Sequence, residues 1–394
     1  MNRVVFALVA ILFLLSISSI TGLIQIVRAD GAPIYINADG SISPSTAPIY
    51  TADNITYTLT GNITSATNGI EIERNNIVLN GAGYTVTGSG KGYDENGTTL
   101  TNMSNVTVKN MTITNFANGI FLYSSDNSTL SGNTVTNDWE GIVLDSSSDN
   151  NTLSGNNVTN NATGIWLESS DNNTLSGNNV TNDFYGIEID YSSNNVLSGN
   201  NVTANSNGGI WLEYSSNCTL SGNNVTANTY GGIDVEESSN CTLSGNNVTA
   251  NGSVGIFLDS SSDDTLSGNN VTANNGFGIT LSDSSNNSIF YNSFVNNTYQ
   301  ILTDGLANVW DNGSVGNYWS DYVTKYPNAV QVDSSGVWNT PYVIDANNTD
   351  YYPLIVPTVV VPEFPSFLFL PLFMIATLLA VIIYKKKGVK TSQS

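Results

Sequence analysis

Acidic side chains recur at one fixed position in a repeated stretch of this sequence. Each lies four residues after the glycine of a Gly-Ile pair, and these glycines are 22 or 23 residues apart. Carboxylate oxygens are ligands that Ca²⁺ accepts in flexible geometry, so one interpretation is a strip of divalent cations. The alternative is a column of solvated carboxylates that splay apart, because neighbours about 4.8 Å apart repel by roughly 1 kcal/mol in water-like surroundings. This acidic column consists of Asp145, Glu168, Asp190, Glu213, Glu236 and Asp259.

A second column, two residues after the same glycines, mixes aromatic and acidic residues. Exposed aromatic rings can stack on the apolar faces of sugar rings, and carboxylates beside them can accept hydrogen bonds from sugar hydroxyls. The pattern therefore predicts an outward stripe that contacts carbohydrate. The alternative is that outward aromatic residues merely suit β-strands or lie beneath another layer. The residues of the stripe predicted to contact carbohydrate are Phe121, Trp166, Glu188, Trp211, Asp234 and Phe257.

An enzyme on the same surface is the main alternative to a binding protein. Glycosidases use two carboxylates about 5–5.5 Å or about 6.5–9.5 Å apart, and the acidic column offers such spacings throughout. The match therefore singles out no catalytic residue. A lyase would need a basic residue to accept a proton, but no Lys or Arg lies between Lys109 and Lys325. We expect binding without turnover, with a polysaccharide hydrolase as the alternative.

The charge balance restricts the partners. The 394 residues include 32 acidic and 10 basic side chains and no histidine, which gives a net charge of −22. A surface of this sign repels nucleic acid. We therefore expect neutral or cationic partners and no nucleic acid.

The repeat itself predicts the elements that carry both columns. One copy, GIWLESSDNNTLSGNNVTNDFY from Gly164, alternates with the period of a β-strand, so that Ile165 and Leu167 point inward while Trp166 and Glu168 point outward. Ser, Asp, Asn and Gly between the apolar positions indicate turns. Each copy is three short strands that cannot bury an apolar face alone. Stacking of the copies predicts an all-β fold, a right-handed parallel β-helix of roughly ten coils with 22–23 residues in each regular coil.

Two further columns have structural interpretations. One asparagine in each copy follows the Ser-Gly of a turn, where stacked amides can hydrogen-bond along the column, so we predict a structural ladder. Cys218 and Cys241 share another column on adjacent coils. A Cα separation of about 4.8 Å lies within the disulfide range, although parallel side chains are not ideally aimed, so a disulfide and two free thiols both remain open. The predicted ladder is Asn133, Asn156, Asn178, Asn200, Asn223, Asn246 and Asn269.

Hydrophobic segments bracket the chain. The first predicts a signal peptide, with an uncleaved anchor as the alternative. The second, Phe367 to Tyr384, is long enough for a transmembrane helix, and the lysines after it predict that the preceding chain lies outside the cell. Many Asn-x-Ser/Thr sites agree with this orientation and predict a glycoprotein. The predicted organisation is a signal peptide at 1–29, a β-helix at 30–298, a C-terminal cap at 299–356, and a sorting signal and transmembrane anchor with a basic tail at 357–394.

The coils resemble the NosD-like repeats of right-handed β-helix proteins, from about Ile34 to Leu354. The blocks 316–322, 341–344 and 350–354 look like the closing segment of archaeal surface proteins in that group. An Asp-rich loop suggestive of calcium binding often follows the first block in that family, but residues 331–339 keep little of its acidic pattern. The NosD name is associated with copper-site assembly, which this chain is poorly equipped for because it lacks histidine.

The C-terminal stretch Val361-Pro-Glu-Phe-Pro365, with the apolar span and lysines after it, resembles the PEF-CTERM signal of archaeal surface proteins. This resemblance implies cleavage near the motif by an archaeosortase and transfer to a lipid anchor, and an ordinary single-pass anchor is the alternative. Both place the protein on the outer face of the membrane. We therefore expect a structural or adhesive surface protein that contacts glycans or envelope polymers, with no cofactor apart from the Ca²⁺ of the first interpretation.

Overall fold

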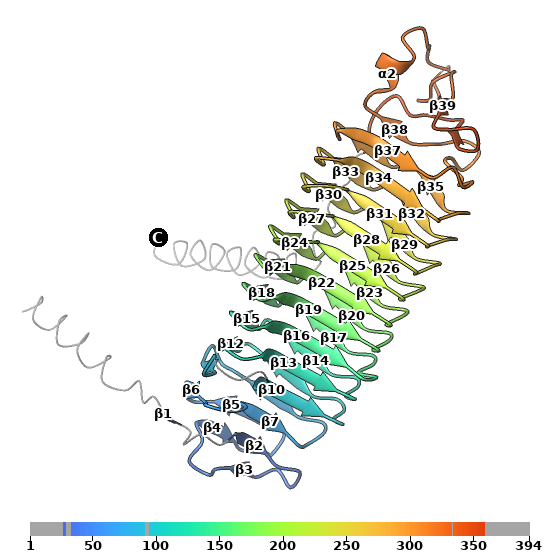
Figure 1. The fold of residues 1–394 in the computed structure, drawn as a ribbon. Helices are drawn as coiled ribbons and strands as arrows, with labels where there is room; N and C mark the ends of the chain where they lie inside the picture. Colours follow the sequence, from blue (N-terminus) through green and yellow to red (C-terminus); the bar gives the residue numbers. More distant parts are fainter. Residues whose placement is uncertain (1–26, 29–32, 91–93, 333, 359–394) are drawn as a thin grey trace, which may run out of the picture. The chain divides into compact units, whose positions relative to one another are not determined.

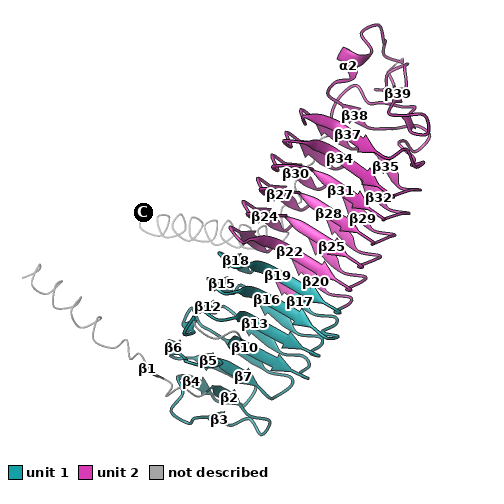
Figure 2. Ribbon diagram, in the orientation of Figure 1, with its two compact units in different colours: residues 1–152, 156–170 teal, residues 153–155, 171–394 magenta. Residues whose placement is uncertain are grey.

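The computed structural model describes residues 27–28, 33–90, 94–332 and 334–358. The predicted transmembrane helix, and all of the predicted signal peptide except residues 27–28, lie outside these ranges. Within the described ranges no helix is long and apolar enough to cross a membrane. The chain divides into two compact units, which we describe separately (Figure 2). Unit 1 contains residues 1–152 and 156–170, and unit 2 contains residues 153–155 and 171–394.

Every regular coil contributes one strand to each of three sheets, which we number alike in both units (Figure 1). Equivalent strands of successive coils pair in parallel, and each residue lies opposite its counterpart in the next coil. The chain makes about 11 turns. The parallel β-helix predicted from the repeat is therefore confirmed.

Unit 1 begins with two antiparallel pairs, β2 (Ile34–Ile36) with β3 (Ile42–Ser43) and β4 (Ile49–Thr51) with β5 (Thr56–Leu59). Its first sheet contains β1 (Val27–Arg28), β6 (Ile63–Thr64), β9 (Thr85–Thr87), β12 (Thr112–Thr114), β15 (Thr134–Thr136) and β18 (Asn157–Thr159). Its second sheet contains β3 (Ile42–Ser43), β2 (Ile34–Ile36), β7 (Ile70–Ile72), β10 (Asn96–Thr101), β13 (Asn118–Tyr123), β16 (Glu140–Asp145) and β19 (Thr163–Glu168). Its third sheet contains β4 (Ile49–Thr51), β5 (Thr56–Leu59), β8 (Val78–Asn80), β11 (Thr107–Lys109) and β14 (Thr129–Ser131), and β17 (Thr152–Ser154) spans the boundary of the units.

Unit 2 contains the most regular coils and the cap. Its first sheet contains β21 (Asn179–Thr181), β24 (Asn201–Thr203), β27 (Asn224–Thr226), β30 (Asn247–Thr249), β33 (Asn270–Thr272), β36 (Ser293–Val295) and β38 (Tyr318–Trp319). Its second sheet contains β22 (Tyr185–Asp190), β25 (Ile210–Glu213), β28 (Ile233–Glu236), β31 (Ile256–Asp259), β34 (Phe277–Ser282) and β37 (Tyr299–Thr303). Its third sheet contains β20 (Thr174–Ser176), β23 (Val196–Ser198), β26 (Thr219–Ser221), β29 (Thr242–Ser244), β32 (Thr265–Ser267) and β35 (Ser288–Phe290).

The core forms because side chains alternate across each strand. In β26 and β27 only the middle residue is buried, whereas β25 buries Ile210 and Leu212 and leaves Trp211 and Glu213 partly exposed. The same positions are buried in the neighbouring coils, so Ile, Leu and Val stack into continuous apolar columns inside each unit.

The repeat glycine has no room for a side chain. A Cβ at Gly232 would lie 2.5 Å from the Gly255 carbonyl oxygen, 2.5 Å from Val248 Cγ1 and 2.8 Å from Asn251 Nδ2. The equivalent atoms lie equally close to Gly209. The coil can therefore close tightly around its interior only where this position is glycine, which explains why the glycine recurs.

The asparagines of the predicted ladder form hydrogen-bonded columns within each unit. Asn223 Nδ2 donates to Asn246 Oδ1 at 2.9 Å and to the Leu197 carbonyl oxygen at 3.0 Å. Asn223 Oδ1 accepts from both the backbone N–H and the side chain of Asn200, each at 3.0 Å. The buried amide is thus fully satisfied, as burial of a polar group requires. In unit 2 this column continues beyond the predicted residues to Asn292 and Asn317.

A second buried column, which the sequence analysis missed, follows the strands of the first sheet. In unit 2 the column begins with Asp183 and continues with asparagines only. Within it, Asn228 Nδ2 donates to Asn251 Oδ1 at 3.0 Å. In unit 1 an aspartate, Asp138, takes the place of an asparagine next to Asn161. The column was visible in the sequence as the Asn or Asp that follows each Asn-Val-Thr strand by two residues.

The cap brings together the three C-terminal blocks of the sequence. Asp350 Oδ2 accepts hydrogen bonds from the Asn317 backbone N–H at 2.7 Å and from Trp319 Nε1 at 2.9 Å, and the Tyr342 ring stacks on Trp319 with centroids 4.4 Å apart. The cap also contains α2 (Tyr322–Lys325) and the antiparallel pair β39 (Tyr342–Val343) and β40 (Thr349–Asp350). Strand β37 still pairs with β34, so the coil pattern extends past the predicted boundary at residue 298.

Candidate functional site

The outward face of the second sheet in unit 2 presents four predicted stripe residues in one row. Glu188, Trp211, Asp234 and Phe257 lie directly opposite one another on β22, β25, β28 and β31. All four side chains are partly exposed. We call these four residues the acidic-aromatic face. Strands β22, β25, β28 and β31 are neighbours in one sheet (Figure 1). Acidic and aromatic residues therefore alternate from strand to strand along it.

Asp234 is the unusual member of this face. Its carboxyl group lies against the turn before the strand, where a Cβ at Gly231 would be 2.7 Å from both of its oxygens. Oδ1 is shielded from solvent and has no hydrogen-bond partner. Burial, and to a smaller extent the nearby Glu236 carboxylate, raises the pKa of Asp234 to about 7. This group can therefore act as a hydrogen-bond donor near neutral pH, unlike an ordinary aspartate.

Trp211 lies beside Asp234 and contacts the preceding coil. Its ring centroid is 5.7 Å from that of Tyr185, which in turn packs edge-on against Phe184 at 4.8 Å. Trp211 Nε1 is shielded from solvent and makes no hydrogen bond of normal geometry. The indole instead interacts with the Glu236 carboxylate on the next coil, where it lowers the pKa of that group against the effects that raise it. Asp234 Oδ1 is thus the shielded polar atom of this face that is left without a partner, which is costly.

The acidic column runs beside this face and is in register within each unit. Asp145 lies opposite Glu168 in unit 1, and Asp190, Glu213, Glu236 and Asp259 lie opposite one another in unit 2. Burial, Glu213 and Asp259 raise the pKa of Glu236, and burial and Asp145 raise that of Glu168. Among the described residues, no three acidic or cysteine side chains are grouped closely enough to hold a metal ion. The calcium strip stays a prediction.

Unit 1 presents a less continuous stripe. Phe121 and Trp166 flank Val143, whose side chain is buried although it occupies an outward position. Glu140, which the sequence analysis did not single out, lies near Asp145 and Glu168. Burial and these two carboxylates raise the pKa of Glu140 to about 7. In unit 2, the role of Gly231 beside Asp234 was not predicted from the sequence, where the doubled glycine before Ile233 is its signal.

The two cysteines are buried free thiols in unit 2. Cys218 Sγ donates to the Ser192 carbonyl oxygen at 3.7 Å, and Cys241 Sγ donates to that of Ser215 at 3.6 Å. The neighbouring Cys218 thiol and burial raise the pKa of Cys241. A disulfide between them stays a prediction for oxidising conditions.

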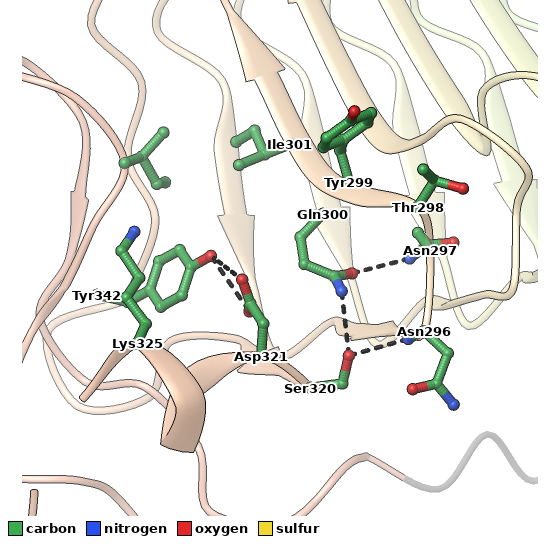
Figure 3. Close-up of a pocket in the computed structure, with 11 residues that line it drawn as sticks. Asn296, Asn297, Thr298, Tyr299, Gln300, Ile301, Ser320, Asp321, Lys325 and Tyr342 are labelled. Atoms are coloured by element: carbon green, nitrogen blue, oxygen red, sulfur yellow. Dashed lines mark hydrogen bonds between the residues drawn. The ribbon is translucent and has the colours of Figure 1, made fainter. Parts of the chain in front are cut away.

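A pocket of about 540 Å³ lies between β37 and the cap of unit 2 (Figure 3). Its polar groups largely engage one another. Gln300 accepts from Asn297 and donates to Ser320, both at 3.1 Å, and Tyr342 donates to Asp321 at 3.0 Å. Lys325 Nζ lies 4.0 Å above the Tyr342 ring and donates to the Val343 carbonyl oxygen. These groups already satisfy one another, so we regard the acidic-aromatic face as the better candidate.

Comparisons with solved structures find matches of low sequence identity. The mannuronan C-5 epimerase AlgE4 A-module of Azotobacter vinelandii is 14% identical with a TM-score of 0.44, and the match covers 71% of this chain and 86% of that one. DFA-IIIase from Arthrobacter chlorophenolicus A6 without its lid is 16% identical with a TM-score of 0.46, covering 58% and 65%. The Dettilon tailspike protein is 14% identical with a TM-score of 0.43, covering 64% and 60%. No curated protein sequence matches this chain.

The family model described as "Periplasmic copper-binding protein (NosD)" matches residues 21–212 and 185–324. The donor set of this chain does not fit copper, which prefers imidazole, thiolate or thioether ligands. The sequence contains no histidine, and the two cysteines are buried in unit 2 while Met103 and Met111 lie in unit 1. The matched residues nevertheless make up well over half of the sequence and span the coils of both units. The chain therefore belongs to the NosD family.

Proposed function

We propose that this protein is an exported, surface-anchored β-helix protein that binds carbohydrate through the acidic-aromatic face without chemical turnover. The observation that carries this proposal is the position of Asp234 between Trp211 and Phe257 on adjacent coils. Aromatic rings can stack on sugar rings, and Asp234 can exchange hydrogen bonds with sugar hydroxyls. The match to a family described as periplasmic supports export.

Binding by the full-length chain to a panel of immobilised polysaccharides tests the proposal, with Trp211→Ala as the diagnostic variant. Loss of one stacked ring costs on the order of 1 kcal/mol, so binding should weaken roughly five- to tenfold. Tyr50→Ala is the matched control, because Tyr50 is 62% exposed and is not part of the face. The proposal fails if no polysaccharide binds, or if both variants bind like the parent protein.

A polysaccharide hydrolase is the second candidate, and one observation favours it. Asp234 has its pKa raised to about 7, and it lies two residues before Glu236 on the same side of β28. Glycosidases divide acid and base roles between two carboxyl groups, and the raised pKa of Asp234 suits the acid. Release of reducing ends by the parent protein, abolished by Asp234→Asn, would establish turnover. Binding without product release would leave the binding protein as the answer.

A further inference from the structure

The surface around the acidic-aromatic face repeats every two coils, although the backbone repeats every coil. On the face itself, aromatic residues occupy alternate coils, with Trp211 on β25 and Phe257 on β31, while Glu188 and Asp234 occupy the coils between. The backbone does not require this alternation, because all four positions are equivalent in the sheet.

The turn made by the two residues before each repeat glycine also varies with a period of two coils. Its aromatic residues lie on the coils that have no aromatic residue on the face. The coils that carry Glu188 and Asp234 have aromatic residues in this turn, Phe184-Tyr185 and Tyr230, and the coils that carry Trp211 and Phe257 have none there. The turns stack in register, because the Asn207 N–H donates to the Phe184 carbonyl oxygen and the Tyr230 N–H donates to that of Asn207. The next coil with a polar residue on the face, Thr280, again has an aromatic turn residue, Phe277.

Aromatic side chains in unit 2 therefore form two parallel rows, one on the face and one in the turns, and successive coils contribute to the two rows alternately. Contact between the rows is diagonal, since the Tyr185 and Trp211 rings lie 5.7 Å apart on successive coils. Phe184 and Tyr230 are 48% and 64% exposed, so the turn row is open to a ligand. Successive coils are about 4.8 Å apart, which makes the period of this surface about 9.6 Å.

A ligand that matches this surface must repeat with the same period. An extended polysaccharide in which each sugar is flipped relative to the last presents the same ring face at every second sugar. One sugar of such a chain is slightly longer than the coil spacing of about 4.8 Å, so a short stretch can stay in register. In that arrangement alternate sugars stack on Trp211 and Phe257, and the sugars between them meet Glu188 and Asp234. A helical polysaccharide turns its rings progressively along the chain and does not match this repeat.

Charge selects among such polymers. The face is bordered by Glu213, Glu236 and Asp259, and Lys325 in the cap is the one basic residue among the described residues of unit 2. A polyuronate would be repelled by this surface. We infer that the acidic-aromatic face binds an uncharged, extended β-1,4-linked polysaccharide, with one sugar per coil across β22, β25, β28 and β31. This inference rests on the proposed carbohydrate binding.

Calorimetric titration of the full-length chain with cello-, manno- and N-acetylchito-oligosaccharides of two, four and six sugars tests it. Affinity for at least one series should rise at least tenfold from two to four sugars and change little from four to six. Maltohexaose, which is α-1,4-linked and helical, and tetragalacturonate, which is anionic, should bind at least tenfold more weakly. Equal binding of maltohexaose or tetragalacturonate would overturn the inference.

A swap variant separates register from composition. Trp211→Asp combined with Asp234→Trp keeps the same residues but places two aromatic side chains on adjacent coils, so binding of the six-sugar ligand should fall at least tenfold while the variant remains folded. Unchanged binding would contradict the register. If other polysaccharides bind through Trp211 but no β-1,4 series does, this inference fails while the proposed function stands. If no carbohydrate binds at all, both fail.

Discussion

Asp138 donates its backbone N–H to Asn161 Oδ1 at 2.9 Å, in the place that an asparagine occupies elsewhere in the same column. Its Oδ1 accepts a hydrogen bond from the Phe116 N–H at 2.7 Å, but its buried Oδ2 has no partner. This oxygen lies 2.8 Å from where a Cβ of Gly119 would be, and the equivalent contact of Gly209 is to the amide nitrogen of Asn228. A protonated Asp138 carboxyl group therefore resembles the asparagine amide more closely than the ionised carboxylate does, because it can donate a hydrogen bond.

Asp138 should make the protein less stable as the pH rises. Burial raises the pKa of Asp138 from 3.8 to about 7, against opposing hydrogen bonds from the Phe116 and Thr136 backbones. The raised pKa means that the folded state holds a proton that the unfolded state loses. The contribution of this bound proton to the free energy of unfolding is therefore fully present below about pH 3.8. It is lost as the pH rises to about 7, at up to about 1.4 kcal/mol per pH unit.

The variant Asp138→Asn removes this slope, because an amide can donate where the ionised carboxylate cannot. We expect a gain of roughly 1–3 kcal/mol in the free energy of unfolding at pH 8 and little change at pH 4. Asp264, whose pKa burial also raises to about 7, offers an independent replicate as Asp264→Asn. Denaturant titrations between pH 4 and pH 8 measure both. An equal gain at both pH values would show that protonation of the aspartate is not the cause.

The asparagine ladder should be a major source of stability. Asn223→Ala removes the acceptor for Asn200 and the donor to Asn246, which leaves buried polar groups without partners. We expect a loss of about 2–4 kcal/mol in the free energy of unfolding. The exposed Asn275 is the matched control, and Asn275→Ala should change stability by less than about 0.5 kcal/mol. Similar losses in both variants would argue against a special role for the ladder.

Glycine at the repeat position should be irreplaceable. Gly232→Ala places a methyl group 2.5 Å from the Gly255 carbonyl oxygen, so the coils must separate, and we expect a loss of about 3 kcal/mol or more. At Gly208 the nearest atom to such a methyl group is Asp234 Oδ2 at 4.0 Å, so Gly208→Ala should cost less than about 1 kcal/mol. Thermal unfolding of both variants checks this, and equal melting temperatures would refute the steric argument.

Gly231 should control the state of Asp234. A methyl group at this position would meet both carboxyl oxygens at 2.7 Å, so Gly231→Ala should push the carboxyl toward solvent. Because burial is the main cause of the raised pKa of Asp234, that pKa should fall toward its ordinary range. Carboxyl ¹³C NMR titration of Asp234 in parent and variant measures it. A pKa that stays near 7 in a folded variant would show that the niche beside Gly231 is not its origin.

The acidic column predicts a response to calcium. Glu236 is crowded by Glu213 and Asp259, and a divalent cation would relieve repulsion of roughly 1–3 kcal/mol per pair. We expect Ca²⁺ to raise the melting temperature by a few degrees relative to EDTA, and Glu236→Gln to reduce that rise. A melting temperature that is the same in Ca²⁺ and EDTA would favour the solvated carboxylates instead.

The sequence alone determined the coil and which of its side chains point inward, because a strand period of two repeated every 22 or 23 residues leaves one way to bury Ile, Leu and Val. It also placed the stripe residues in one row, since register in a parallel stack follows directly from the repeat length. Only the tertiary structure decided which members of that row differ from the rest. The burial of Asp234 depends on the space that Gly231 leaves in the turn, and the Asp138 oxygen without a partner lies against Gly119. Such effects depend on the path of the backbone and on contacts between strands, and the spacing of residues does not encode them.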